Sequence, residues 1–352
     1  MTNLYHSIYE NEIFVKSRCI WHENTLLDIF RSILISLGYT SQDTSNKVWQ
    51  RKEKTVVVCL VDDFSTCSTN YSAILPYLFD ADTTVITDNY ITCPTQYRVF
   101  QLPSSFFGIY AHTPLEQVSA PSRRFNFSVN RLDAKRLLMF LEMQLRASNI
   151  IGSETLDYVN FNCWSWDGAN DSQAGLQENF QRQYEQLEPQ FRDVYQQTFD
   201  RLLPQMPYTN HSLSHEQSHV SAHVNIVMET YSSDTTVALS EKIFRALCLP
   251  TPWMVYSGKY TVAYLRSLGF DVMHDIIQHK YDNMVENKTA AFGDKMVDFI
   301  FEGVEAVDAM PETIKERSNI AATHNQQLLY TMQQKWPTDF ASWLPPVINH
   351  IK

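Results

Sequence analysis

The residues from 240 to 242 have the types and the spacing to hold a phosphorylated ligand. Ser240 stands at the expected start of a helix, where its side chain can cap the first turn, and Glu241 and Lys242 follow it. The first turn of a helix has N–H groups without intrahelical partners and a partial positive charge, which together stabilise a diphosphate. A carboxylate beside that turn can accept hydrogen bonds from both hydroxyls of a ribose. These residues therefore predict a site for a nucleotide-linked sugar.

The elements that must position this site are predicted from the spacing of apolar residues. The helix that begins at Ser240 has one apolar face, formed by Ile243, Phe244, Leu247 and Cys248. Pro250 stops this helix, and Arg245 lies with Glu241 and Lys242 on the side away from the core. Residues 237–274 as a whole predict a helix, a strand, a helix and a last strand at 270–273, and another strand is predicted at 224–228.

Short motifs follow one another through this part of the chain. In order they are Glu229-Thr230, Ser240-Glu241-Lys242-Ile243-Phe244, Pro252-Trp253, Tyr264-Leu265-Arg266-Ser267-Leu268-Gly269-Phe270, Asp275 and Tyr281-Asp282. This series resembles the donor domain of fucosyltransferase-like glycosyltransferases of the GT-B fold, over roughly residues 123–300 and most strongly over 225–282. The resemblance implies an α/β protein with two Rossmann-like, doubly wound domains that face each other across a cleft. It also implies transfer of a sugar from a nucleoside diphosphate, with inversion at the anomeric carbon.

The resemblance implies which residues bind the donor. An arginine at the junction between a strand from residue 125 and a helix over 132–147 would neutralise the diphosphate. The expected donor-binding set is Asn130, Arg131, Arg136, Glu229, Ser240, Glu241, Lys242 and Arg245. Asp275, Tyr281 and Asp282 are expected to brace this site from a loop. The alternatives are a solvated basic helix start for the arginines, a helix-dipole partner for Glu241 and a solvent-facing strand end for Glu229.

A general base is expected in the first part of the chain. Residues 55–61 are a continuous β-branched run, typical of a buried parallel strand, and a shorter strand is predicted over 83–87. These strands lead to Asp62, Asp63 and Asp88 at the carboxyl edge of an open sheet, where ligands bind. Asp63 is the preferred base, which takes the acceptor proton as the oxygen attacks the anomeric carbon. The alternative is that these carboxylates cap the next helices.

The chain of 352 residues is long enough for two domains. We expect an acceptor-binding α/β domain over 1–120, a nucleotide-sugar-binding domain over 121–320, and a helical segment over 321–352 that packs back on the first domain. A helix over 25–37 should end at Gly38, a strand is predicted over 156–162, and polar surface helices over 173–203. Further helices are predicted over 292–336, with a break near Pro311.

Composition restricts the location and the cofactors. There is no run of about 18 apolar residues, so no membrane span is expected, and the six scattered cysteines suit a reduced, cytoplasmic protein, in the host cytoplasm if the chain is viral. The nine glycines form no phosphate-binding loop. The diphosphate must then be held by helix ends and basic side chains. No metal or other cofactor is expected, and the nucleotide sugar is a co-substrate.

Two classes of acceptor remain open. The net charge of −11 argues against a surface that binds nucleic acid as a whole and suits a glycan or small-molecule hydroxyl. The Asn-, Tyr- and Phe-rich, Gly-poor composition is phage-like, which favours a hydroxymethylated base of phage DNA, flipped into the cleft. Two basic clusters could then contact phosphates: Lys47, Arg51, Lys52 and Lys54, and Arg123, Arg124, Arg131, Lys135 and Arg136.

Two other functions compete with sugar transfer. His215-Glu216-Gln217-Ser218-His219 has the spacing that holds zinc on a helix with glutamate as general base, which would make the chain a zinc metallopeptidase. The flanking residues are polar and lack the apolar face of a buried zinc-binding helix, so this string is interpreted as a loop. A non-catalytic sugar-nucleotide-binding protein is the other alternative.

Overall fold

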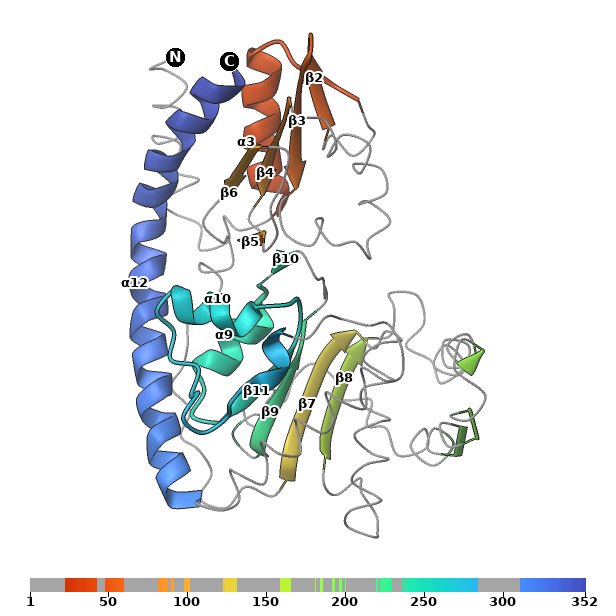
Figure 1. Cartoon of the computed structure of the whole chain (residues 1–352), viewed down its shortest axis with the longest axis vertical. Coiled ribbons are helices and arrows are strands. Elements are labelled where there is room, and N and C mark those ends of the chain that lie inside the picture. The colour runs from red at the N-terminus through yellow and green to blue at the C-terminus, as the bar shows by residue number, and fades with distance from the viewer. Residues whose placement is uncertain are drawn as a thin grey trace.

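The computed structural model describes a part of the chain that holds three sheets and a long C-terminal helix (Figure 1). The described residues are 23–42, 48–59, 82–87, 90–91, 98–101, 123–131, 159–165, 220, 222–229, 236–237, 239–283 and 311–352, with isolated positions between 181 and 200. Within them the architecture is mixed α/β. The α/β class predicted from the sequence is therefore correct.

The first sheet has five strands in the order β1-β2-β3-β4-β6. Its elements are α3 (Glu23–Ser36), β1 (Thr40–Ser41), β2 (Val48–Arg51), β3 (Lys54–Cys59), β4 (Thr83–Thr87) and β6 (Arg98–Gln101). The helix predicted before Gly38 and the strand predicted over 83–87 are confirmed, and the strand predicted over 55–61 is confirmed up to Cys59, where the described residues end. β3, β4 and β6 are parallel, whereas β1, β2 and β3 pair antiparallel. This sheet is thus mixed, because Lys52, at a φ of 56°, turns β2 into a hairpin with β3.

The second sheet is wholly parallel, in the order β11-β9-β7-β8. Its strands are β7 (Arg123–Arg131), β8 (Val159–Ser165), β9 (Ala222–Met228) and β11 (Trp253–Tyr256). The chain passes from β7 to β8 on one side, and then continues with β9 and β11 on the other side. In chain order this is a 2-1-3-4 arrangement, whose direction reverses at β7.

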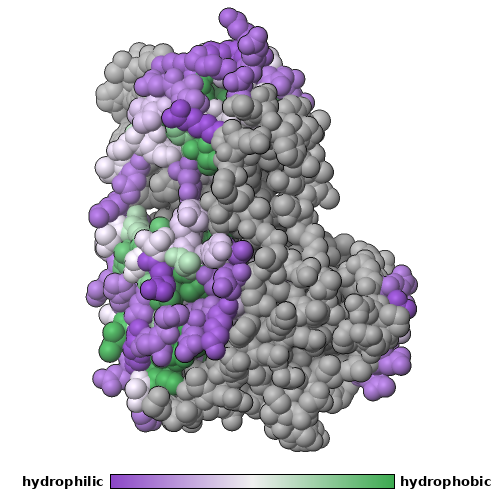
Figure 2. Space-filling view, in the orientation of Figure 1, coloured by the Kyte–Doolittle hydropathy of each residue, from purple (hydrophilic) through white to green (hydrophobic). Residues whose placement is uncertain are grey.

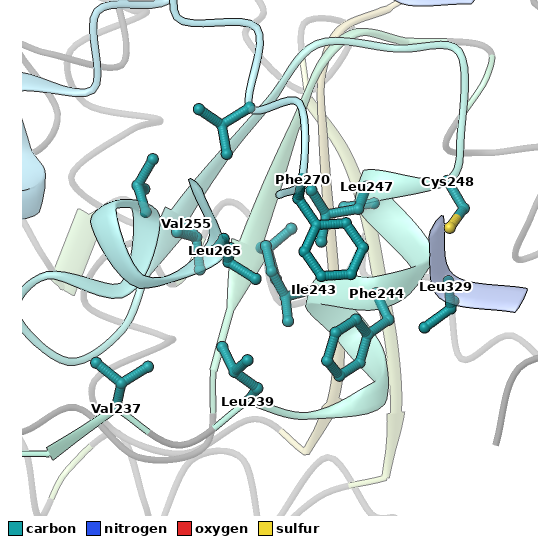
Figure 3. Packing of buried hydrophobic residues seen from close by; sticks show 14 of the residues in the cluster. Val237, Leu239, Ile243, Phe244, Leu247, Cys248, Val255, Leu265, Phe270 and Leu329 are labelled. Atoms are coloured by element: carbon teal, nitrogen blue, oxygen red, sulfur yellow. The ribbon is translucent and has the colours of Figure 1, made fainter. Parts of the chain in front are cut away.

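Two short helices pack on this sheet around one core. α9 (Glu241–Leu247) and α10 (Thr261–Ser267) follow β9 and β11, and a 3-10 turn, η6 (Lys280–Asn283), comes after them. Figure 3 shows side chains of α9, α10 and β11 converging, with Leu329 of the C-terminal helix at the edge. The strand predicted at 270–273 is wrong. Gly269, at a φ of 94°, turns the chain, and Phe270, Val272 and Met273 pack into the core from an irregular segment.

The helix α12 (Pro311–Ile351) lies along both sheets (Figure 1). In the first half of the helix, the buried Asn325 donates from Nδ2 to the carbonyls of Leu247 and Asp271, at 2.8 and 2.9 Å. At its end, the carbonyl of Ile351 accepts from the Tyr39 hydroxyl at 2.7 Å. A proline at the first position suits a helix start, and α12 begins at Pro311. The residues before Pro311 lie outside the described part of the chain, so the break predicted there stays a prediction. Beyond Pro311 there is one helix rather than several.

A second connection joins the sheets away from α12. The strand β5 (Tyr90–Ile91) pairs antiparallel with β10 (Thr236–Val237). Beside this pair the Tyr90 ring stacks on Tyr264 of α10, with centroids 4.2 Å apart, and Gln101 donates to the Tyr264 hydroxyl at 3.0 Å. The carboxyl ends of β4 and β6 therefore approach α10.

On the face shown in Figure 2, the described surface is mostly hydrophilic. Figure 2 shows isolated hydrophobic side chains among hydrophilic ones along the α12 side of the molecule, without one continuous apolar patch. Among the residues that the structure describes, no helix is both long enough and apolar enough to cross a membrane.

Candidate functional site

The candidate site lies at the carboxyl edge of the second sheet. Because the strand order reverses at β7, the gap between the ends of β7 and β9 is the topological switch point, where open parallel sheets bind their ligands. Ser128 pairs with Val227, and Tyr256 of β11 pairs with Met228, which fixes the register of this edge. Asn130 and Arg131 end β7, and Glu229 follows β9. The fold thus brings the backbone of these three predicted donor residues to one edge.

Glu229 is fixed at the start of α9. Its side chain is buried, with a relative exposure of 4%, so the alternative of a solvent-facing strand end is wrong. Oε1 accepts from the Ser240 backbone N–H at 3.2 Å, and Oε2 accepts from the Ser240 hydroxyl at 2.5 Å. This carboxylate therefore holds the residue that begins the helix.

Ser240 is the N-cap of α9, as predicted. Its Oγ accepts from the backbone N–H of Lys242 at 3.3 Å and lies 3.3 Å from the Lys242 ammonium, which donates to it. The hydroxyl thus links the buried carboxylate of Glu229 to a half-buried cation. A negatively charged ligand at this helix start would meet the positive charge of Lys242 and also the negative charge of Glu229. Arg245 is half-buried in the last turn of α9.

The loop between β11 and α10 presents an aromatic side chain at the same edge. Tyr260 has a left-handed backbone, with φ 66° and ψ 21°, and its side chain is 40% exposed. A bulky residue persists in this conformation only where its surroundings fix it. The Tyr260 N–H donates to the carbonyl of Asp282 at 2.7 Å, and the Lys259 ammonium lies 4.9 Å from the centre of the tyrosine ring. Lys259 and Tyr260 were not predicted from the sequence, because no local pattern predicts a left-handed tyrosine.

Asp282 caps α10 from a distant part of the chain. Its carboxylate accepts from the N–H groups of Val262 and Ala263, at 2.7 and 2.9 Å. Burial raises the pKa of Asp282, although these two N–H groups act in the opposite direction. The carboxylate takes the place of the side-chain cap that Tyr260 lacks. Asp282 therefore braces the loop.

Tyr281 and Asp275 also make bracing contacts. The buried Tyr281 hydroxyl accepts from the Val255 N–H of β11 at 3.1 Å, and burial raises its pKa well above the ordinary value. Asp275 is exposed and accepts from Nε of Arg317 at 2.7 Å. Hydrogen bonding to Arg317 lowers the pKa of Asp275, against the smaller effect of burial. These contacts join the segment after α10 to β11 and to α12.

Several predicted residues lie outside the described part of the chain. These are Asp62, Asp63, Asp88, Arg136 and the zinc-site candidates His215, Glu216 and His219, as well as the side chains of Asn130, Arg131 and Glu241. The described residues on either side of Asp88 are Thr87, which ends β4, and Tyr90, which stacks on Tyr264. Within the described ranges, no three His, Cys, Asp or Glu side chains gather closely enough to hold a metal ion.

One predicted basic cluster is wrong. Arg123 and Arg131 are the first and last residues of β7, which has nine residues. At about 3.3 Å per residue, an extended strand of this length places their backbones about 26 Å apart. Close spacing in the sequence does not bring basic residues together when they lie on one strand.

Comparison with models of known protein families gives no match, and comparison with curated protein sequences gives none either.

Proposed function

We propose that the chain is a glycosyltransferase that moves a sugar from a nucleoside-diphosphate donor to a hydroxyl acceptor. The observation that carries this proposal is the reversal of strand order at β7, with Glu229, Ser240 and Lys242 gathered at the carboxyl edge of the adjacent strand β9. Open parallel sheets bind nucleotides at such an edge. The motif series that resembles the donor domain of fucosyltransferase-like enzymes supports the same conclusion and suggests a GT-B arrangement of two facing domains.

The proposed donor site uses cations without a metal. Lys242 and Arg131 balance the charge that develops on the leaving diphosphate, with help from Arg136 and Arg245, and Glu241 accepts from the ribose hydroxyls. Ser240 keeps the Lys242 ammonium at the helix start through its 3.3 Å contact. Glu229 acts as a positioning residue, because both of its oxygens bind Ser240.

The proposed chemistry is a single displacement. The acceptor oxygen attacks the anomeric carbon and forms the new glycosidic bond, while the bond from that carbon to the diphosphate oxygen breaks and its electron pair leaves with the nucleoside diphosphate. The acceptor proton passes to a carboxylate of the first sheet, for which Asp63 is preferred and Asp62 and Asp88 are alternatives. The acceptor is a glycan or small-molecule hydroxyl, or a hydroxymethylated base of phage DNA.

Ligand-induced stabilisation tests the donor site. Nucleoside diphosphates and their sugars should raise the melting temperature of the protein, since a ligand that binds the native state stabilises it by mass action. Lys242→Gln should weaken this binding about tenfold or more, because a charge-assisted hydrogen bond contributes about 1.5–3 kcal/mol. Arg266→Gln is the matched control, since Arg266 is exposed in the last turn of α10. If no nucleoside diphosphate or nucleotide sugar stabilises the protein, the proposal is wrong.

A further inference from the structure

Basic side chains gather at the edge of the first sheet where its parallel strands begin. Lys54 is the first residue of β3, and Arg98 is the first residue of β6, on either side of β4. Thr84 of β4 pairs with Val56 on one side and with Arg98 on the other. Side chains alternate along a strand, so Lys54 lies on the same face as Val56, Thr84 and Arg98.

The end of α12 lies on this face. His350 Nε2 is 3.1 Å from the Thr84 hydroxyl, and the His350 ring lies 5.2 Å from the ring of Phe100. The Arg98 guanidinium lies over the same Phe100 ring, 5.1 Å from its centre. Burial lowers the pKa of His350, and the positive charges of Arg98 and Lys54 lower it further. Three basic groups from three elements are thus within electrostatic reach of one another.

The hairpin between β2 and β3 extends these basic side chains into a row along the edge of the sheet. The Arg51 guanidinium already donates hydrogen bonds within the protein, to the carbonyls of Leu37, Ile351 and Lys352. The next residue, Lys52, is exposed in the turn, as is Glu53. The described charged residues at this edge are Arg51, Lys52, Glu53, Lys54, Asp82, Arg98 and Lys352. Five cations against two carboxylates give a local positive excess, in a chain whose net charge is −11.

We propose that this edge binds the phosphate backbone of a nucleic acid, with Lys52, Lys54 and Arg98 as its phosphate contacts. Lys54 and Arg98 are two strands apart and offset along them, so their backbones are separated by roughly 12 Å. Duplex DNA carries a negative charge about every 1.7 Å along its axis, so exposed cations in a row of this length can each reach a phosphate. The proposal goes beyond sugar transfer and does not depend on it.

A nucleic acid suits this row better than a membrane surface does. Binding at a membrane surface usually combines cations with inserted apolar side chains. The large apolar side chain within the row, Phe100, is half-buried beneath Arg98. The row lies at the amino ends of β3 and β6, whereas the candidate bases of the first sheet follow the carboxyl ends. β3 has six residues, so an anion bound here is about 17–20 Å from that other edge.

The salt dependence of DNA binding tests this proposal. Binding of a fluorescent duplex of about 20 base pairs should weaken with salt, with a slope of log K against log salt near −3 for three phosphate contacts. The double variant Lys54→Glu/Arg98→Glu should bind at least about tenfold more weakly and should reduce the slope by about 2. The double variant Arg31→Glu/Lys335→Glu makes the same change of charge at exposed positions of α3 and α12, and should bind as the wild type does.

A second double variant tests whether misfolding, rather than loss of charge, explains weaker binding. Lys54→Gln/Arg98→Gln removes the charges without reversing them. This variant should also bind the duplex more weakly than the wild type does, at an unchanged melting temperature.

The pH dependence of DNA binding gives a second test. A phosphate near His350 favours the protonated form of its ring, so the affinity for DNA should rise as the pH falls from about 7.5 to about 5.5, and His350→Gln should lose this rise. Equal binding by the wild type and Lys54→Glu/Arg98→Glu would overturn the proposal. So would an equal loss in Arg31→Glu/Lys335→Glu, or binding to anionic lipid vesicles with none to DNA.

Discussion

His279 makes the stability of the second sheet sensitive to acid. Its ring is buried, and Nε2 lies 2.8 Å from the carbonyl oxygen of Val272. A carbonyl can only accept, so Nε2 carries the proton, and Nδ1 of the neutral ring accepts from the Tyr281 hydroxyl at 2.5 Å. That hydroxyl in turn accepts from the Val255 N–H. One neutral tautomer therefore completes a chain of hydrogen bonds that ends on β11.

The size of the effect follows from the pKa of His279. This pKa is lowered from 6.5 to about 4, chiefly by burial; the Val272 hydrogen bond acts in the opposite direction, and the charge of His274 adds a smaller lowering effect. The unfolded chain takes up the proton near pH 6.5, and the folded chain resists it down to about pH 4. The unfolded state therefore binds more protons between these values, so stability is lost as the pH falls through this window. The full loss is about 3 kcal/mol, and most of it is reached by pH 4.5.

Urea unfolding at pH 7 and at pH 4.5 measures this loss. Other groups titrate over the same range, so the quantity of interest is the difference in pH dependence between the wild type and His279→Gln. A glutamine does not titrate and can still donate and accept, so the variant should lose about 2–3 kcal/mol less on acidification. His274→Gln is the comparison at an exposed neighbouring histidine: it removes only the smallest of the effects on the pKa of His279, so it should lose nearly as much stability as the wild type. If His279→Gln and the wild type lose stability equally, the argument from burial and tautomer is refuted.

Three further changes test the contacts around the site. Ser240→Ala should destabilise the protein by about 1–2 kcal/mol in urea unfolding, because it removes the α9 cap and a partner of a buried carboxylate. Asn325→Ala should cost about 3 kcal/mol, since it leaves buried backbone groups without partners, whereas Asn319→Ala at an exposed site of α12 should change little. Burial would raise the pKa of Asp271, but hydrogen bonds from Arg317 lower it overall. Arg317→Met should therefore reduce stability at pH 7 and flatten its further loss below about pH 4, measured by thermal unfolding across pH.

The parts of the fold that local patterns specify could be predicted from the sequence. The buried strands β3 and β4 carry continuous β-branched runs, and β9 carries a mainly apolar run that His223 and Asn225 interrupt. A serine followed by an apolar stripe specifies α9. The cap at Ser240 was predictable because the capping contact is local. The partner of that serine, Glu229, is 11 residues away, and the direction of its side chain is set by tertiary packing.

Other features depend on contacts that no local pattern encodes. The segment 270–273 alternates like a strand, but its buried residues pack into the core without pairing. α12 continues through Pro337, Pro345 and Pro346, which local propensity would assign to breaks. Tertiary contacts at Asn325 and at Ile351 hold this helix on both sheets. The left-handed Tyr260 depends on Asp282, which lies 22 positions further along the chain.

The two connections between the sheets differ in strength, and this difference decides where they can separate. At α12, buried polar groups on both sides satisfy helix-end carbonyls: Asn325 donates to Leu247 of α9, and Tyr39 donates to Ile351 of α12. Breaking the first contact leaves the buried Leu247 carbonyl without this partner, and breaking the second leaves the buried Tyr39 hydroxyl without its acceptor, at about 1–3 kcal/mol each. At the other connection, the stacked pair of Tyr90 and Tyr264 contributes only about 0.5–1.5 kcal/mol beyond its buried area. We therefore expect the contacts of α12 to be lost last if the sheets separate, after the Tyr90 stack, the Gln101 hydrogen bond and the two-residue pairing of β5 with β10.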